Sequence, residues 1–341
     1  MGAKTRGDYP RTLGEFYRRF PSDDACWAYL VETRWPSGFI CPACGSTDAT
    51  ALAARRVWEC RSCLRQTSAS AGTVLHRSKL PLTAWFAAAY LVATLKPGIS
   101  ALQLQRQLGL TRYETAWLLL HKLRRAMVAP DRALLAGTVE VDEAWVGGAQ
   151  PGLRGGRQRA GRKTLMVVVA VELRPKSLGR VRLEVVPDDT APTLLGFVRR
   201  NIAPGSTVVT DAFQGYAGLA KLGYTHQPVS QAALKQAGQV GNAVPGVHRV
   251  ISNLKTWLMG THHGVGADHL DHYLDEFVFR FNRRYFPMAG FATLLGLGAD
   301  LPPTPTSQIL APLPPGSTTR RKGRATRLTA TKLRGPAAPV P

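Results

Sequence analysis

The sequence predicts an α/β protein, in which a mixed sheet flanked by helices follows a cysteine-rich segment and a helical region. Strand-like apolar segments gather between residues 138 and 211, and helical periodicity returns after them. Four of the five cysteines occur as two close pairs. Between the cysteines and the strands, apolar residues recur at helical spacing.

The cysteine pairs predict a structural zinc site. Cys41 and Cys44 form one CxxC pair and Cys60 and Cys63 the other, with room for a short hairpin between them. Each pair makes a tight knuckle that directs two thiolates at one point, and four thiolates in a tetrahedron suit Zn²⁺ without leaving a position for water. The fifth cysteine, Cys26, lies in a helical segment, and we expect it to be a buried, inert thiol.

The charge balance indicates a polyanionic partner. Lys and Arg total 44 against 22 Asp and Glu, which gives a formal charge of +22 over 341 residues. Such a field favours nucleic acid first and an anionic membrane second. The longest apolar run, residues 84–95, is too short to span a bilayer, and the N-terminus lacks the apolar core of a signal peptide. We therefore expect a cytoplasmic protein with no membrane partner.

Two helical segments precede the strands. Residues 12–34 predict two short helices separated by Pro21, with Ser22 or Asp23 capping the second. After a buried helix that begins at about Leu80, residues 98–127 have the outline of a helix-turn-helix.

In that outline, Ser100 caps the first helix, Gly109 begins the turn and Thr111 caps the second helix. The second helix is basic and suited to groove or phosphate contacts. The DNA-binding candidates on it are Arg112, Lys122, Arg124 and Arg125. The alternative is an ordinary helical hairpin with a solvated basic face.

The strand region supplies two candidate catalytic acids. In "VEVDEAWVGG", alternation places Glu140 and Asp142 on one face of a strand and Glu143 on the other. Acids on one strand face repel each other unless they are solvated or a cation lies between them. The segment "STVVTDAFQGY" ends a second apolar strand at Asp211. If the two strands are neighbours, Asp142 and Asp211 form the minimal cradle for Mg²⁺.

A later helix supplies the third candidate ligand. In "VHRVISNLKTWLMGTHHG", Val247 begins an apolar stripe, while His248 and Lys255 lie on another stripe two turns apart. His248 would serve as a ligand and Lys255 as a phosphate-directed cation.

The following helix offers an alternative third acid, Glu276. It shares a face with Arg280 and Arg283, and two guanidiniums would draw its carboxylate into ion pairs. We therefore interpret the trio as a brace or a clamp on backbone phosphate, and count both arginines as DNA-binding candidates.

These motifs resemble the zinc-ribbon DDE transposases of bacterial insertion sequences, the IS1595 or ISXO2-like group. The resemblance covers about residues 12–288. It is carried by the two CxxC pairs and by "VEVDEAWVGG", "VVTDAFQGY", "VHRVISNLKTWLMGTHHG" and "YLDEFVFRFNRR". Together these motifs are specific, whereas each strand motif alone is weak. The resemblance implies an RNase H-like catalytic fold, two catalytic Mg²⁺ or Mn²⁺ ions, and cutting and joining of transposon ends.

Asp142 and Asp211 match the first two acids of this family, and Glu140 and Glu143 would set the local field. Many relatives have Glu or Asn in the third place, seven residues before a Lys, where this chain has His248 before Lys255. Imidazole is a softer ligand than carboxylate and favours Mn²⁺ or Zn²⁺ over Mg²⁺. At this position the chain departs from the family pattern, so both a site that is active with particular ions and an inactive site stay open.

Five segments are expected along the chain. They are an N-terminal helical segment (1–35), the zinc ribbon (36–75), the helix-turn-helix-like region (76–130), the RNase H-like domain (131–290) and a disordered Pro/Arg-rich basic tail (291–341).

The expected function is that of an insertion-sequence transposase, an enzyme that cleaves and transfers strands of double-stranded DNA at transposon ends and target sites. Because two ends must be held together, we expect a homo-oligomer. The alternative is a non-catalytic DNA-binding regulator or decayed transposase, which His248 in the third place motivates. A structural RNA-binding protein would explain the charge but not the paired acids.

Overall fold

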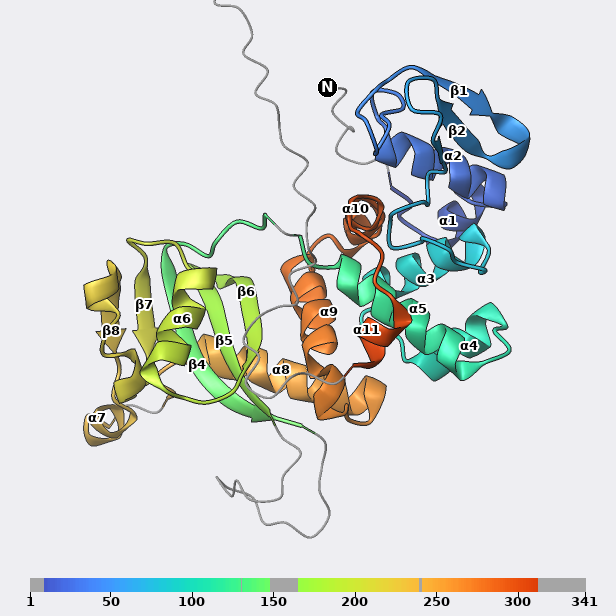
Figure 1. The fold of residues 1–341 in the computed structure, drawn as a ribbon. Helices are drawn as coiled ribbons and strands as arrows, with labels where there is room; N and C mark the ends of the chain where they lie inside the picture. The colour runs from blue at the N-terminus through green and yellow to red at the C-terminus, as the bar shows by residue number, and fades with distance from the viewer. Residues whose placement is uncertain (1–8, 130, 148–164, 239–240, 312–341) are drawn as a thin grey trace, which may run out of the picture.

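The computed structural model describes residues 9–129, 131–147, 165–238 and 241–311. Figure 1 shows two parts side by side, a five-stranded sheet with helices on its faces and a mostly helical part that carries a small N-terminal sheet. Helix α9 (Leu270–Asn282) lies between them and contacts both β6 of the large sheet and α5 of the helical part.

The N-terminal segment forms the two predicted helices, α1 (Leu13–Arg19) and α2 (Asp23–Arg34). The Thr12 side chain accepts a hydrogen bond from the backbone of Glu15, and Ser22 caps α2 in the same way. Both helices have acids in the first turn and arginines in the last, which matches the helix dipole.

The cysteine segment forms a small antiparallel sheet in the order β1-β2-β3. Its strands are β1 (Ala49–Leu52), β2 (Val57–Cys60) and β3 (Gln66–Thr67). The 3₁₀ turn η1 (Ala53–Arg55) and Arg56, which has a left-handed φ of 51°, close the hairpin between β1 and β2. The predicted hairpin is thus confirmed.

The helical region contains α3 (Leu82–Thr94), α4 (Ala101–Leu108) and α5 (Tyr113–Ala126). Ser100 caps α4 as predicted, and Gly109 ends it with a left-handed φ of 62°. The predicted cap at Thr111 is wrong. Residue Arg112 holds the N-cap position of α5, and no side chain caps that helix, because α5 begins one residue later than expected.

The large sheet is mixed, as predicted, with the strand order β6-β5-β4-β7-β8. Its strands are β4 (Thr138–Val146), β5 (Leu165–Arg174), β6 (Ser177–Val186), β7 (Thr207–Thr210) and β8 (Thr225–Pro228). Strands β4, β5 and β6 pair antiparallel, whereas β7 pairs parallel with both β4 and β8. Strands β4, β6, β7 and β8 therefore run in one direction and end at the same edge.

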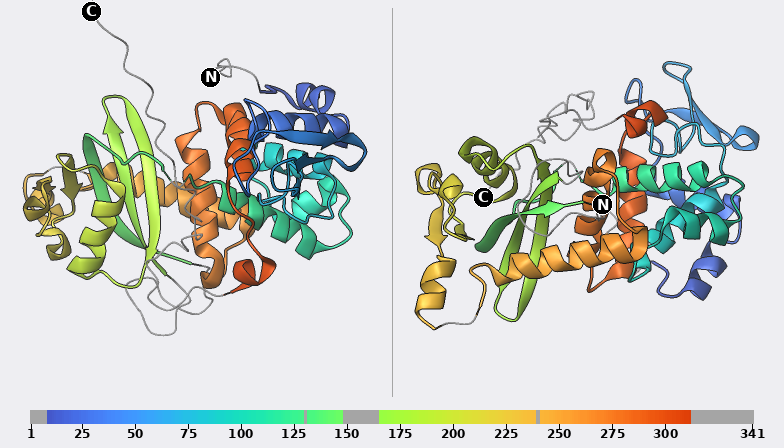
Figure 2. Two further views of the ribbon diagram at one scale, coloured as in Figure 1. Left: turned by 45° about the horizontal axis from the view of Figure 1, so that its top comes forward. Right: turned by 90° about the horizontal axis from the view of Figure 1, so that it is seen from below.

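Helices cover both faces of this sheet (Figure 2). On one face α6 (Ala191–Asn201) packs in a core with Val168 of β5. On the other, α8 (Pro245–His262) and α9 pack in a core with Val169 of the same strand. Successive residues of β5 thus serve opposite cores, which explains its unbroken apolar run. The remaining elements are η2 (Gln214–Tyr216), η3 (Ala220–Leu222), α7 (Gln231–Gln236), η4 (Ala267–His269), α10 (Pro287–Asp300) and α11 (Thr306–Leu310).

The prediction that a disordered tail starts at residue 291 places its start too early in the sequence, because residue 291 lies within helix α10. Phe291 and Leu294 of α10 are buried, and the Phe291 ring lies 5.7 Å from that of Phe16 and 6.1 Å from that of Phe86. These side chains complete the aromatic core of α1, α2 and α3, so residues 291–311 belong to the folded part. Residues 312–341 lie outside the described residues.

The length and apolar character of the described helices show whether they could span a membrane. None of them is long and apolar enough to cross a bilayer.

Candidate active site

Strand β4 presents its acids as the alternation predicts. On the face toward α8, Glu140 Oε2 accepts a hydrogen bond from the backbone N–H of Val247, 2.9 Å away in the first turn of that helix. On the opposite face, Glu143 Oε2 accepts a hydrogen bond of 3.0 Å from the Tyr216 hydroxyl. Burial raises the pKa of Glu140, and the helix N-terminus accommodates its carboxyl.

Asp142 and Asp211 meet at the edge where the parallel strands end. Glu140 of β4 is the register partner of Val209 of β7, and Asp142 and Asp211 each follow these partners by two residues, Asp211 just past the end of β7. Both acids line one pocket of about 490 Å³. Each is oriented locally, since Asp142 Oδ1 accepts from the N–H of Glu143 at 2.8 Å and Asp211 Oδ1 from the N–H of Phe213 at 3.0 Å.

Helix α8 brings His248 to the same pocket. Its Nε2 lies 3.7 Å from Asp142 Oδ2, and its side chain is about half exposed. The apolar stripe that starts at Val247 is buried as predicted, so the opposite stripe faces outward. Lys255 lies on that outward stripe two turns further along, exposed and outside the pocket lining.

The pocket holds a further acid that the sequence did not single out, Asp189. It follows β6, which runs in the same direction as β4 and β7, so all three strands deliver an acid to one edge. A signal in the sequence could have identified this acid, because the pair Asp188-Asp189 directly follows an apolar strand. Gln231 and Lys235 of α7 also line the pocket, and α7 had no counterpart in the predicted elements.

Glu143 is a carboxyl that can hold a proton near neutral pH. Burial raises its pKa to about 7, and the negative charges of Asp142, Asp211 and Asp189 add to the effect. The hydrogen bond from Tyr216 acts in the opposite direction, and the buried tyrosine keeps its own proton because its pKa is raised well above the usual value. The pocket therefore combines a buried carboxylate, Asp142, and two partly buried ones, Asp189 and Asp211, with one carboxyl that can hold a proton.

The donor set of the pocket fits a divalent cation. Carboxylate oxygens are the ligands that Mg²⁺ and Mn²⁺ prefer, and an imidazole shifts that preference toward Mn²⁺. Within the described residues, however, only one group of three or more His, Cys, Asp or Glu side chains has its ligand atoms all within 4.8 Å of one another. That group is the four cysteines of the ribbon, so the acids of the pocket and His248 do not form a compact cluster. Joint binding of one ion by Asp142, Asp211 and His248 therefore requires rotation of their side chains.

The four cysteines of the ribbon fit a structural zinc ion. The Sγ atoms of Cys41 and Cys63 are 3.6 Å apart, and those of Cys44 and Cys60 are 3.5 Å apart. A zinc–sulfur bond of about 2.3 Å in tetrahedral geometry separates the sulfurs by about 3.8 Å, close to these distances. Cys26 is fully buried away from the cluster, in agreement with its predicted role.

Two predicted DNA contacts are instead structural. The Arg124 side chain is 1% exposed, and its Nε donates to Glu276 Oε2 at 2.8 Å. Arg280 donates to the same carboxylate at 3.5 Å and to the backbone oxygens of Leu95 and Lys96. The assignment of Arg124 to DNA is wrong because a buried, paired guanidinium does not reach a phosphate. Glu276 is fully buried between the two arginines, which rules out its role as the alternative third acid in this arrangement.

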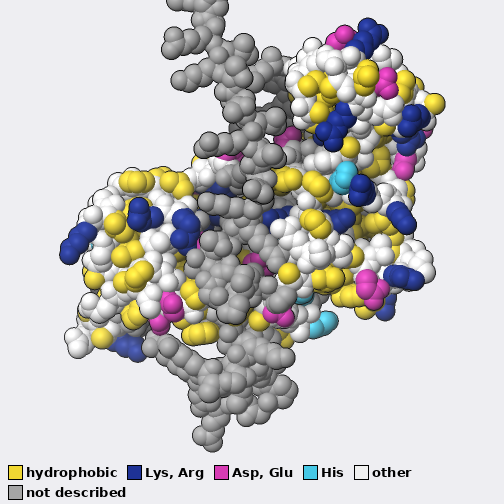
Figure 3. Space-filling view, in the orientation of Figure 1, with side chains coloured by type: hydrophobic (Ala, Val, Ile, Leu, Met, Phe, Trp, Pro, Cys, Tyr) yellow, Lys and Arg dark blue, Asp and Glu magenta, His cyan; other side chains and the backbone are white. Residues whose placement is uncertain are grey.

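The other basic candidates differ in exposure. Arg112 is exposed at the start of α5, whereas Arg125 in its last turn is partly buried. Lys122 is also partly buried, and burial lowers its pKa. The Arg283 guanidinium lies 4.0 Å from the centre of the Phe279 ring and does not pair with Glu276. In Figure 3 basic side chains occur over both the sheet part and the N-terminal part of the visible face.

The fold and the pocket define a zinc-ribbon α/β protein with acids gathered at one edge of a mixed sheet. Residues 134–282 match the family described as the ISXO2-like transposase domain, and residues 21–66 match the transposase zinc-ribbon domain. The chain belongs to this zinc-ribbon, ISXO2-like transposase family. No curated protein and no solved structure matches the chain.

Proposed function

We propose that the protein is an active DDE-type transposase with an RNase H-like catalytic domain. The sheet supports this fold, because three antiparallel strands are extended on one side by two parallel ones in the order β6-β5-β4-β7-β8. The observation that carries the proposal is the convergence of Asp142, Asp211 and His248 on one pocket, with His248 Nε2 3.7 Å from Asp142.

Asp142, Asp211 and His248 would hold the catalytic Mg²⁺ or Mn²⁺. Two such ions, when bound, lower the pKa of an attacking water and stabilise the departing 3′ oxygen. The aspartates define the positions that flank the scissile phosphodiester. His248 makes the site softer than one with three carboxylates.

Glu143 in the pocket and Lys255 outside it would hold a proton and position the strand, respectively. Glu143 lies behind Asp142 with a pKa of about 7 and can keep a proton, which limits the negative charge that faces a phosphate. Exposed Lys255, two turns from His248, would contact a phosphate next to the cut. The freed 3′ hydroxyl of the transposon end would then attack target DNA in the same pocket.

Binding of the transposon ends would fall to the ribbon and to α4 and α5. The exposed Arg112 at the start of α5 is the strongest DNA contact among the predicted ones, since it precedes the helix that a helix-turn-helix inserts into the major groove. Holding two ends together implies a homo-oligomer on double-stranded DNA. Because these contacts neutralise phosphates, end binding should weaken steeply with salt.

Cleavage of end-containing duplex DNA in Mn²⁺ tests the proposal. Asp142→Ala and Asp211→Ala should abolish cutting and strand transfer while end binding stays at the wild-type level. Asp268→Ala is the matched control, because Asp268 is exposed and lies outside the pocket. Cutting by Asp142→Ala at the wild-type rate would refute the assignment.

A second candidate function is end binding without catalysis. It is favoured by the separation of the three candidate ligands, which do not form a compact cluster in the described structure. The wild-type protein decides between the two: a regulator leaves bound DNA intact in Mg²⁺ and in Mn²⁺, whereas the transposase cuts it.

A further inference from the structure

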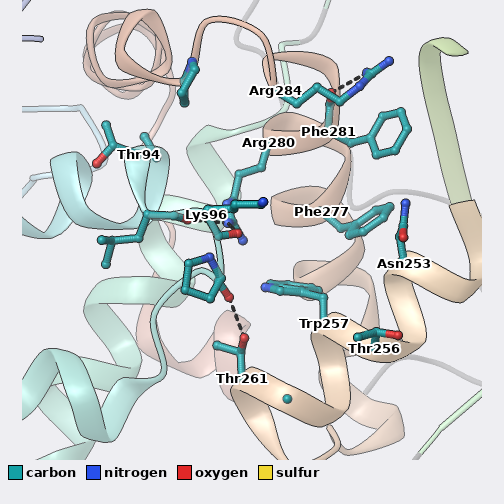
Figure 4. Close-up of a pocket in the computed structure, with 15 residues that line it drawn as sticks. Thr94, Lys96, Asn253, Thr256, Trp257, Thr261, Phe277, Arg280, Phe281 and Arg284 are labelled. Carbon is teal, nitrogen blue, oxygen red and sulfur yellow. Dashed lines mark hydrogen bonds between the residues drawn. The ribbon is translucent and has the colours of Figure 1, made fainter. Parts of the chain in front are cut away.

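A larger pocket, of about 840 Å³, lies between the loop after α3 and helices α8 and α9 (Figure 4). One wall is aromatic. The Trp257 ring lies 5.9 Å from the Phe277 ring, and Phe281 follows one turn later on α9, 5.8 Å from Phe277. None of the candidate catalytic residues lines it, so this pocket is distinct from the acidic one.

The charge of this pocket is positive. Lys96, Arg280 and Arg284 line it, and its described lining contains no Asp or Glu. Arg280 and Arg284 are held by backbone oxygens, among them those of Leu95 and Phe281. Lys96 is exposed, and its ammonium has no ion-pair partner among the described residues. The pocket therefore has one exposed cation, Lys96, and two cations whose guanidiniums are held by hydrogen bonds, Arg280 and Arg284.

Polar groups complete the lining. Asn253 and Thr256 of α8 are exposed and offer an amide and a hydroxyl to a ligand. Thr261 instead donates its hydroxyl hydrogen to the Pro97 carbonyl at 2.5 Å, which fixes the loop that carries Lys96 against α8. Figure 4 shows Asn253, Thr256 and Thr261 along α8, the helix that also carries Trp257.

We propose that this pocket binds an unpaired nucleobase of the DNA strand, stacked among Trp257, Phe277 and Phe281, with its phosphate on Lys96. Aromatic faces stack with any base, cations attract the adjoining phosphates, and an amide can pair with a base edge. An apolar peptide would leave Lys96 and Arg284 without a carboxylate in the pocket lining, whereas Arg280 is already paired with Glu276. A paired base in a duplex would not expose the face that the rings contact.

The position of the pocket links it to the proposed transposase reaction, on which the inference rests. Trp257 follows His248 by nine residues on α8, about 14 Å along the helix axis. At about 100° per residue, the same nine residues place Trp257 on the opposite side of α8 from His248. A strand that is cut at the acidic pocket would therefore have to pass around α8 to place an unpaired base in the aromatic pocket.

Photo-crosslinking tests the inference on the full-length protein. The probe is a 20-nucleotide single-stranded oligodeoxynucleotide with one 5-iodouracil, compared with the same strand in a duplex. We expect crosslinks to Trp257, Phe277 or Phe281 with the single strand and their loss with the duplex. Lys96→Glu and Trp257→Leu should each weaken single-strand binding about tenfold, in line with the loss of one stacked or charge-paired contact.

Two matched variants control for charge and for aromatic surface. Lys176→Glu removes an exposed lysine in the β5–β6 turn, and Tyr285→Leu removes an exposed aromatic ring outside the lining. Both should bind the single strand like the wild type. Lys96 is exposed, so its variant keeps the test valid if Trp257→Leu fails to fold.

The outcomes separate this inference from the proposed function. If the protein cuts duplex ends but crosslinks only elsewhere, and both variants bind like the wild type, the pocket assignment is overturned while the function stands. If Trp257 crosslinks in a protein that never cuts DNA, the pocket stands and the catalytic proposal falls.

Discussion

Arg124 of α5 and Glu276 of α9 form a fully buried ion pair, with 2.8 Å between Nε and Oε2, that joins the helical part to the sheet part. The Arg124 guanidinium also lies 3.9 Å from the centre of the Tyr273 ring. Arg124→Ala removes the closer of the two guanidiniums from the buried Glu276 carboxylate and leaves only Arg280, at 3.5 Å, so it should lower the free energy of unfolding by up to about 3–5 kcal/mol. Urea denaturation measures the change.

The pair Arg200–Glu184 is the control for that prediction. Its arginine is about half exposed, so Arg200→Ala should cost less than about 1 kcal/mol. Equal losses in the two variants would show that the Arg124–Glu276 pair does not join the two parts.

The zinc ribbon should contain one zinc ion per chain, measured by elemental analysis. Cys60→Ser removes one of four thiolates and should release the metal and unfold the ribbon, because structural zinc supplies the folding free energy of such modules. Cys26→Ala should keep the metal, since Cys26 is buried elsewhere and burial raises the pKa of its thiol to about 12. Full zinc content in Cys60→Ser would contradict the four-thiolate site.

Folding stability should fall in mild acid because of a buried histidine cluster. His121, His262 and His272 have ring nitrogens without hydrogen-bond partners among the described residues. Burial lowers the pKa values of His262 and His272 to about 4 and that of His121 further. The unfolded chain binds these protons near pH 6.5, so the stability is complete above that pH and declines as the pH falls toward 4.

Within that pH window, each buried imidazole lowers the free energy of unfolding by about 1.4 kcal/mol for each unit that the pH falls. Urea midpoints measured between pH 7 and pH 4 report the slope. His121→Phe should flatten it, whereas His263→Asn, at an exposed position with a left-handed φ of 55°, should leave it unchanged. A slope that is the same in wild type and His121→Phe would contradict the buried neutral state.

The ion preference of cleavage should follow residue 248. His248→Glu replaces a soft nitrogen with a hard oxygen beside Asp142, so the ratio of Mg²⁺-supported to Mn²⁺-supported cutting should rise severalfold. Lys255→Gln is the comparison, because loss of a phosphate contact should slow cutting equally in both ions. An unchanged ratio in His248→Glu would exclude His248 from the metal site.

Local rules predicted much of this molecule from its sequence. Alternation in "VEVDEAWVGG" placed Glu140 and Glu143 on opposite faces, and cysteine spacing located the metal cluster. The sequence located the two apolar strands that carry Asp142 and Asp211 but left their adjacency as a condition, and the parallel pairing of β4 and β7 meets it. These features could be predicted because they depend on residues that are close in the sequence or on the two-residue alternation of side chains along a strand.

The failures concern contacts between distant segments. A basic residue on an amphipathic helix looks exposed, and nothing local showed that Arg124 would meet Glu276 across two parts of the fold. Asp189 joined the site only because β6 runs parallel to β4, which the sequence does not state. Phe291 belongs to a core most of whose members lie between Phe16 and Met127, far away in the sequence, so its segment was taken for a tail. The boundaries between the first four segments stay predictions.

The most direct test of the account is Mn²⁺ binding followed by electron paramagnetic resonance, since it reports the metal site without requiring cleavage. The zinc-loaded wild-type protein should bind Mn²⁺ at the acidic pocket, and both Asp142→Asn and Asp211→Asn should lose that binding while keeping zinc. Mn²⁺ bound equally by the wild type and both variants would contradict the convergence of these two aspartates on a catalytic cation.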